Sequence, residues 1–235
     1  MPKRLLLAFT LLGTAAHAQV RFSAGPQLGY TLATTTYQLF AVADYDTHYR
    51  SGFSGGLTAE LGLGHLVVRP AVLYTQKGYN QEEVRSGASL TTTSRMRTDY
   101  LTLPLQVGYT QHADGQGFQV FAGPYVGLIL GGHYTRDVVY GAGSSGGAQQ
   151  QTYSGGVVAE GTSIGTANYP IRHWDAGFQA GIGYRQQQWL AQLDYSRGLL
   201  NADSDRAWAS SFYGSTAYHN CVFQFSLAYL FGVKS

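Results

Sequence analysis

Apolar and polar residues alternate with a period of two over several segments of the chain, which is typical of β-strands with one apolar and one polar face. From 172 to 185, for example, Trp174 and Phe178 fall on one face, and Asp175 and Gln179 fall on the other. Eight segments follow the pattern, some strictly and some with irregularities: 20–32, 52–64, 66–77, 100–110, 118–131, 172–185, 189–199 and 220–231. The alternation therefore predicts an all-β chain.

The connections between these segments alternate between short and long. The short ones are Gly64-His65, His112 to Gln116 and Gln186-Gln187, and the long polar ones are about 33–49, 80–94, 136–170 and 200–217. Outer-membrane barrels have an even number of antiparallel strands, short periplasmic turns and longer extracellular loops. The pattern thus predicts an eight-stranded antiparallel up-and-down transmembrane β-barrel, with short periplasmic turns and long extracellular loops.

The polarity of the two faces separates this barrel from a soluble eight-stranded barrel, which holds apolar residues inside. Here the face with small and polar side chains includes Gln27, Glu60 and Arg69, whereas the opposite face is almost uniformly aliphatic or aromatic. Such a face would aggregate in water and is expected in lipid. Aromatic residues near the short turns are expected to form a periplasmic girdle: Phe22, Tyr109, Tyr184, Trp189 and Tyr229.

Composition and the N-terminus agree with an exported barrel. Only 12% of the residues are charged, against about 25% in soluble domains. Lys3 and Arg4 precede an apolar run that ends in the small-x-small pattern Ala16-His17-Ala18. We therefore expect a signal peptide at 1–18 and a barrel domain at 19–235, located in the outer membrane of a Gram-negative bacterium. No basic patch of the kind that binds nucleic acid is visible.

Five short segments carry a resemblance to a known family. They are Ser51-Gly-Phe-Ser-Gly-Gly-Leu57, Arg69-Pro-Ala-Val-Leu-Tyr-Thr-Gln-Lys-Gly78, Asp99-Tyr-Leu-Thr-Leu-Pro-Leu105, Phe121-Ala-Gly-Pro-Tyr125 and Asp175-Ala-Gly-Phe-Gln-Ala-Gly-Ile-Gly-Tyr184. In this order and spacing they resemble the PorT-like outer-membrane β-barrel family, also described as a porin family, although Ala71 stands where that family usually has Glu. The resemblance implies an eight-stranded barrel in the outer membrane. It implies no single activity, because the namesake is a secretion accessory and a fold does not fix a function.

A polar network is expected inside the barrel. If Gly64-His65 is a two-residue turn, the hairpin register places Glu60 opposite Arg69, with both side chains pointing inward. An unpaired charge in a narrow interior is unfavourable, so an opposed pair is the stable arrangement. The predicted lumen network is Glu60, Arg69, Gln106, Gln179, Arg185, Gln192, Asp194 and Gln224.

The same register argument applied to Gln186-Gln187 pairs Gln179 with Asp194 and leaves Arg185 near the periplasmic mouth. Eight strands leave an interior just wide enough for side chains, so we expect the lumen to be plugged rather than open. A gate for protons or small ions is the alternative interpretation of these polar residues.

Motifs for catalysis or metal binding are not visible in the sequence. Six histidines stand singly, without paired ligand spacing and without a nucleophile elbow around any serine: His48, His65, His112, His133, His173 and His219. We therefore expect no enzymatic activity, no catalytic residue, no cofactor and no metal site.

The long connections are the expected place for recognition, since loops on a rigid scaffold often carry it. The stretch around 141–156 is rich in Gly, Ser and Gln and is predicted to be flexible. The candidate contact residues are Tyr134, Tyr140, Tyr153, Trp208, Phe212 and Tyr213. Charges of both signs in these connections could meet lipopolysaccharide or a protein partner, or could simply be solvated.

Two classes of function follow from these expectations. The first is a structural or surface-interaction protein that contacts outer-membrane lipid, lipopolysaccharide or a protein through its extracellular part. The second is a transport-related component, either a narrow channel or a PorT-like accessory of protein secretion.

Overall fold

A computed structural model describes residues 20–38, 44–85, 90–141, 149–161, 168–201 and 217–233. Its strands are β1 (Val20–Gln38), β2 (Asp44–His48), β3 (Arg50–Leu63), β4 (Leu66–Arg85), β5 (Leu90–Thr110), β6 (Gly117–Tyr140), β7 (Gln149–Ala159), β8 (Tyr169–Ile171), β9 (Trp174–Gln186), β10 (Trp189–Gly198), β11 (Ala217–Tyr229) and β12 (Phe231–Val233). Over these ranges, no helix is long and apolar enough to cross a membrane.

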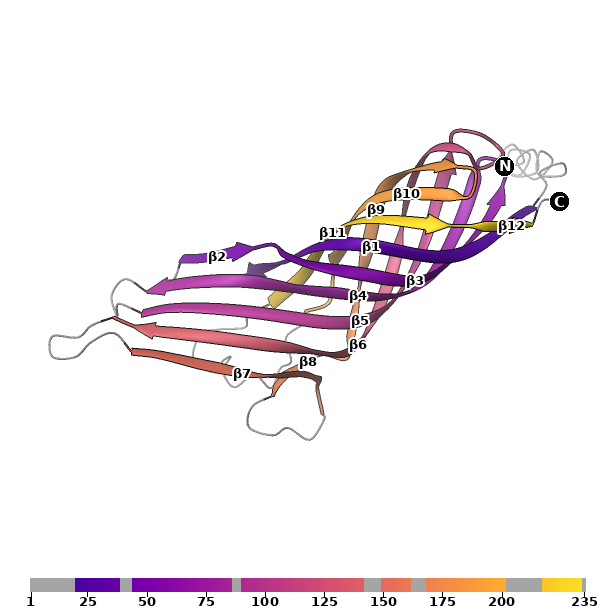
Figure 1. The fold of residues 1–235 in the computed structure, drawn as a ribbon. Helices are drawn as coiled ribbons and strands as arrows, with labels where there is room; N and C mark the ends of the chain where they lie inside the picture. Colours follow the sequence, from indigo (N-terminus) through magenta and orange to yellow (C-terminus); the bar gives the residue numbers. More distant parts are fainter. Residues whose placement is uncertain are drawn as a thin grey trace, which may run out of the picture.

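Eight of the strands close into a ring, which Figure 1 shows at the upper right. Their order around the barrel is β1, β3, β4, β5, β6, β9, β10 and β11, each antiparallel to its neighbours. The ring closes between β1 and β11, where Gln27 lies opposite Ala228, and β12 continues the pairing with β1. These strands correspond to the alternating segments of the sequence, so the predicted barrel is confirmed.

The strands on one side of the ring extend well beyond the alternating segments. β4, β5 and β6 continue as paired strands, so the expected loop at 80–94 is largely a hairpin. β7 pairs with β6, and the expectation of a flexible loop at 141–156 is wrong for 149–156. Figure 1 shows these strands projecting away from the ring. Outside lipid neither face of a strand has to be apolar, so the hydrogen-bonded ladder continues without the sequence signal.

Short turns close the opposite end of the barrel. Gly64 connects β3 to β4 with φ at +57°, a left-handed conformation that glycine adopts without a steric penalty. The turn between β9 and β10 consists of Gln187 and Gln188, with φ at +55° for Gln187. The predicted turn at 186–187 is therefore wrong by one residue. A turn displaced by one residue shifts the register of the whole hairpin by two.

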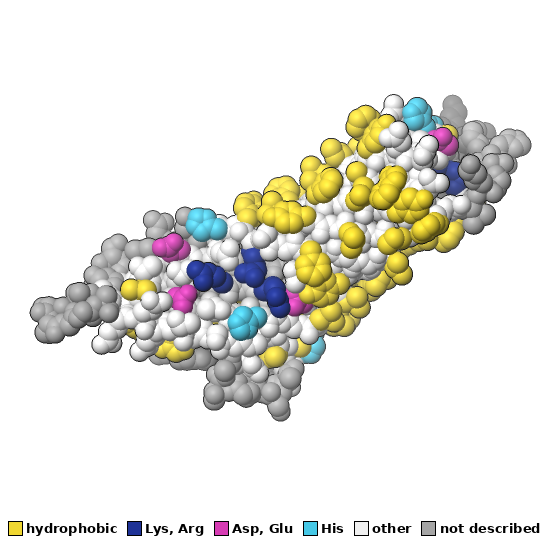
Figure 2. All heavy atoms as spheres, in the orientation of Figure 1, with side chains coloured by type: hydrophobic (Ala, Val, Ile, Leu, Met, Phe, Trp, Pro, Cys, Tyr) yellow, Lys and Arg dark blue, Asp and Glu magenta, His cyan; other side chains and the backbone are white. Residues whose placement is uncertain are grey.

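The outward face of the barrel is apolar, as predicted. Leu28, Leu57 and Phe178 are 70%, 64% and 59% exposed. Figure 2 shows hydrophobic side chains over the turn-side half of the molecule and charged ones over the projecting half. Near the turns the rings of Trp189 and Tyr229 pack edge to face, with their centroids 4.9 Å apart. An apolar band bordered by aromatic residues is the surface expected to contact lipid.

Candidate functional site

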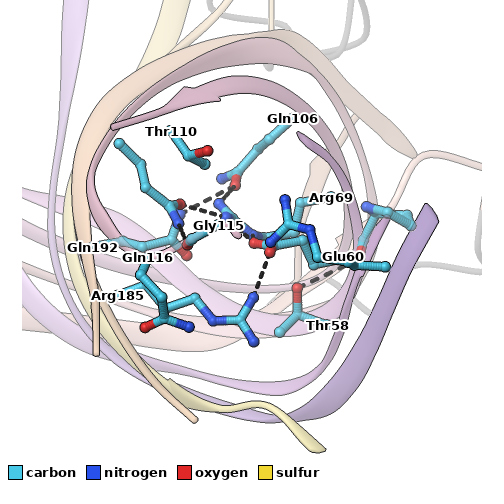
Figure 3. A network of polar contacts seen from close by, with 12 residues as sticks. Thr58, Glu60, Arg69, Gln106, Thr110, Gly115, Gln116, Arg185 and Gln192 are labelled. Atoms are coloured by element: carbon cyan, nitrogen blue, oxygen red, sulfur yellow. Dashed lines mark hydrogen bonds and ion pairs between the residues drawn. The ribbon is translucent and has the colours of Figure 1, made fainter. Parts of the chain in front are cut away.

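The lumen near the turns is filled by a network centred on Glu60. Arg69 Nε donates a hydrogen bond to Glu60 Oε2 at 3.2 Å, Arg69 Nη2 donates to the same oxygen, and each side chain is only 2% exposed. The two residues meet as the hairpin register predicts. On the other side of the carboxylate, Arg185 Nη1 donates to Glu60 Oε1. Glu60 therefore lies between two arginines, as Figure 3 shows.

Glutamine side chains complete the coordination of Arg69. Its Nη1 donates to Gln106 Oε1 at 3.1 Å and its Nη2 to Gln119 Oε1 at 2.6 Å. Gln192 in turn donates from Nε2 to Gln106 Oε1 at 3.2 Å. Gln119 is absent from the predicted set, although its position near the start of an alternating segment was a usable signal. A buried charge is tolerated when its hydrogen-bonding capacity is met in this way.

Arg185 lines the turn-side opening and also joins the network around Glu60. The sequence places it near the periplasmic mouth, and its Nε does donate to the backbone oxygen of Gln187 in the turn at 3.2 Å. Its Nη1, however, reaches across the lumen from β9 to Glu60 on β3. The turn-side opening in front of it has a volume of about 1090 Å³, and Arg21 and Gln116 are among the residues that line it.

The middle of the lumen contains Gln179, Asp194 and Gln224. The predicted pairing of Gln179 with Asp194 is wrong: Gln179 lies opposite Ser196, and Asp194 lies opposite Gly181, because of the displaced turn. The three side chains instead line one small cavity of about 20 Å³. Gln179 Nε2 is buried and has no hydrogen-bond partner among the described residues. A cavity of this size and polarity suits one water molecule.

A second buried ion pair, which the sequence-based set does not include, lies toward the projecting end. Lys77 Nζ contacts Asp175 Oδ2 at 2.8 Å, and the two side chains are 3% and 1% exposed. Tyr125 and Asn220 donate to the same oxygen at 3.3 and 3.0 Å. Lys77 Nζ also lies 4.3 Å from the centroid of the Tyr125 ring, within cation–π range.

Acidic and basic side chains are both buried in the lumen. Six charged side chains are buried in the described residues: Glu60, Asp175 and Asp194 are acidic, and Arg69, Lys77 and Arg185 are basic. Pairing with an opposite charge reduces the electrostatic penalty of placing an ion in a narrow interior. Glu60, Arg69 and Arg185 form one ionic layer of the lumen, and Lys77 and Asp175 form a second layer.

An apolar cluster lies beyond the second ion pair, at the projecting end. Met96, Tyr100 and Ile129 from the barrel pack with Val157 of β7 and Ile171 of β8. Tyr134, Tyr79, Ala159 and Tyr169 pack against this cluster. Tyr134, predicted as a loop contact residue, therefore serves packing on β6.

The other predicted contact residues divide into two groups. Tyr140 and Tyr153 are 43% and 50% exposed on β6 and β7. Trp208, Phe212 and Tyr213 lie outside the described residues. Across the part of the chain that the structure describes, no group of three or more His, Cys, Asp or Glu side chains is placed to hold a metal ion.

The ring, the apolar outer face and the polar interior define a transmembrane β-barrel. The family model described as outer membrane protein beta-barrel domain matches residues 17–204. The chain belongs to this family, and it is a protein of the Gram-negative outer membrane. A search of curated proteins found no match.

Several solved structures are similar to this chain. The attachment invasion locus protein Ail of Yersinia pestis, solved with the heparin analogue sucrose octasulfate, is 9% identical with a TM-score of 0.39, covering 89% of this chain and 99% of Ail. OprG from Pseudomonas aeruginosa is 12% identical with a TM-score of 0.41, covering 92% and 97%. Neisserial surface protein A is 14% identical with a TM-score of 0.35, covering 89% and 97%.

The outward face of β10 gives a direct test of the lipid contact. Leu193 is 51% exposed in the middle of this strand. We expect Leu193→Arg to lower the free energy of unfolding in liposomes by about 2–4 kcal/mol, the range for arginine facing the bilayer midplane. Tyr153→Arg is the control, because Tyr153 is equally exposed but lies on β7, and we expect a change below about 0.5 kcal/mol. Equal effects of the two substitutions in urea titrations would contradict the placement of the membrane.

Proposed function

We propose that this protein is a non-conducting outer-membrane barrel that acts at the cell surface through its extracellular part. The observation that carries the proposal is the Glu60 network, in which buried side chains of β3, β4, β5 and β9 are hydrogen-bonded to one another across the lumen. An ion or solute crossing this level would have to break charge-assisted hydrogen bonds, which are the stronger class. In this proposal the barrel anchors the protein in the outer membrane and does not conduct ions or solutes.

The projecting strands supply the surface for contact. β4, β5, β6 and β7 form a continuous sheet there, and Tyr140 and Tyr153 expose aromatic rings on it. Tyrosine gives large contact area for little loss of conformational entropy, which makes it common at binding surfaces. The partner in this proposal is a protein or saccharide outside the cell, and the proposal includes no catalytic activity and no cofactor.

Conductance across planar bilayers tests the non-conducting lumen. We expect the purified protein to give no stable single-channel steps, because side chains fill the interior of an eight-stranded barrel. The triple variant Glu60→Ala/Arg69→Ala/Arg185→Ala, inserted under the same conditions, is the comparison, since it removes the side chains of one plug level. Large stable steps from the unmodified protein would refute the proposal.

The turn-side opening favours a second candidate, a transport-related accessory such as a PorT-like component of secretion. With about 1090 Å³ lined by polar residues that include Arg21, His112 and Asp114, this opening could receive a periplasmic partner. Deletion of the gene distinguishes the candidates. Loss of a defined set of secreted proteins supports the accessory role, and normal secretion with altered surface binding supports the first proposal.

A further inference from the structure

The outward face of β5 changes character abruptly along the strand. Leu103, Leu105 and Val107 are exposed apolar side chains at alternate positions. The next alternate positions on the same face, toward the projecting end, are Asp99, Arg97 and Arg95. Arg97 is 43% exposed and Arg95 is 57% exposed. The lipid-facing run therefore ends where a charged run begins, which places these arginines at the outer boundary of the membrane.

A third arginine joins this group from a neighbouring strand. Arg50 begins β3, and the intervening strand β4 contributes Gly78, which lies opposite Arg97. Burial lowers the pKa of Arg50 most, the positive charges of Arg97 and Arg95 lower it further, and the negative charge of Asp99 raises it. At Gly78 a Cβ atom would lie 2.0 Å from the backbone oxygen of Met96, so β4 packs closely against β5 here and contributes no side chain to the group.

Partial neutralisation leaves this cluster with excess positive charge. Arg97 Nε lies 3.4 Å from Asp99 Oδ1, and Arg95 Nη1 lies 3.7 Å from Asp137 Oδ2. Three arginines thus face two carboxylates, and the exposed His133 lies opposite Arg97 on β6. Figure 2 shows Lys and Arg side chains gathered beside the edge of the hydrophobic band. Holding like charges close together raises the free energy of the folded protein, and a bound anion would lower it.

We propose that Arg50, Arg95 and Arg97 form a binding site for the phosphate groups of an outer-leaflet phosphoglycolipid, the lipid A part of lipopolysaccharide. The position of the cluster selects this ligand. When a phosphate group of lipid A binds there, the acyl chains of the same molecule lie alongside Leu101, Leu103 and Leu105 on the same face of the strand. One continuous protein surface then contacts both the headgroup and the acyl chains. Guanidinium groups bind phosphate through paired charge-assisted hydrogen bonds. The site does not depend on whether the lumen conducts.

Titration with lipid A tests this site. The protein, purified from outer membranes in detergent, is titrated with bisphosphorylated lipid A in mixed micelles, with lipid A stripped of phosphate, and with heparin. We expect binding of the bisphosphorylated form to weaken about fivefold for each arginine replaced by glutamine, and about a hundredfold for R50Q/R95Q/R97Q. We expect little binding of the stripped lipid or of heparin.

Arg197 supplies the matched control. It is exposed, follows Leu193 and Tyr195 on the outward face of β10, and belongs to the far side of the ring. R197Q removes one charge at a similar boundary and should change affinity by less than about twofold. Circular dichroism checks that each variant is folded, and R95Q/R97Q replaces the triple variant if that one is not.

Three results would overturn the site. They are unchanged lipid A affinity in the folded arginine variants, equal binding of lipid A with and without phosphate, and heparin binding as tight as that of lipid A. The last result would assign the cluster to a sulfated saccharide instead. A conductance measurement that refuted the plugged lumen would leave this site untouched, so the two proposals fail separately.

Discussion

Replacing Glu60 by alanine is expected to lower the free energy of unfolding by about 3–5 kcal/mol, the range for breaking a buried ion pair by removing one partner. Glu60 accepts hydrogen bonds from both Arg69 and Arg185, and its carboxylate is 2% exposed. Without it, two guanidinium groups face each other in the lumen with only glutamine and backbone oxygens as acceptors. A urea titration in liposomes, followed by tryptophan fluorescence, measures the change.

Glu82→Ala is the control for this experiment. It removes the same charge from an exposed position on β4, and surface substitutions of this kind change stability by less than about 0.5 kcal/mol. The double variant Glu60→Ala/Arg69→Met should recover part of the loss, because one uncompensated charge is removed with its partner. An unfolding midpoint for Glu60→Ala equal to that of Glu82→Ala would show that the network contributes little to stability.

Local hairpin geometry explains why the sequence alone leads to the Glu60 contact with Arg69. The two residues lie on strands joined by a turn whose glycine identifies its position, so counting back from Gly64 fixes the register. The same reasoning misplaces Gln179 and Asp194, since the run Gln186 to Gln188 contains no glycine to mark the turn. A turn can be located within one residue and still give the wrong pairs.

Contacts across the lumen could not be predicted from the sequence. Arg185 and Glu60 are in contact although they are 125 positions apart in the sequence, and Lys77 and Asp175 are 98 positions apart. Alternation places all four side chains on the inward face, but the level at which they meet depends on the stagger of the closed barrel. That stagger includes the register shift between Asp99 and Tyr100, which no pattern of polarity reveals.

The projecting strands show the complementary limitation. Period-two alternation predicts strands only where one face is apolar, so it stops at the outer edge of the lipid-facing surface. Beyond that edge, pairs such as Gln81 with Ser94 and Glu82 with Thr93 continue the ladder through backbone hydrogen bonds alone. The sequence therefore identifies the membrane segment of the barrel, and it treats an ordered extracellular sheet as loops.

Replacing Lys77 by methionine is expected to lower the free energy of unfolding by about 3 kcal/mol, near the lower end of the range for a broken buried pair. Methionine fills similar space against Tyr125, so the loss reports mainly on Asp175, which becomes a buried carboxylate without its cation. Tyr125 and Asn220 still donate to it, which limits the effect.

Adding Asp175→Asn to Lys77→Met should restore most of the lost stability, because the remaining charge is then removed while an oxygen acceptor is kept for Tyr125 and Asn220. Arg95→Met is the matched control: it makes the same change of charge at a 57% exposed position and should alter stability by less than about 0.5 kcal/mol. Urea titrations of the four proteins compare these effects directly. If the double variant is no more stable than Lys77→Met alone, Lys77 stabilises the barrel through packing rather than through its charge. The pairing of Lys77 with Asp175 would then not be what stabilises this level of the lumen.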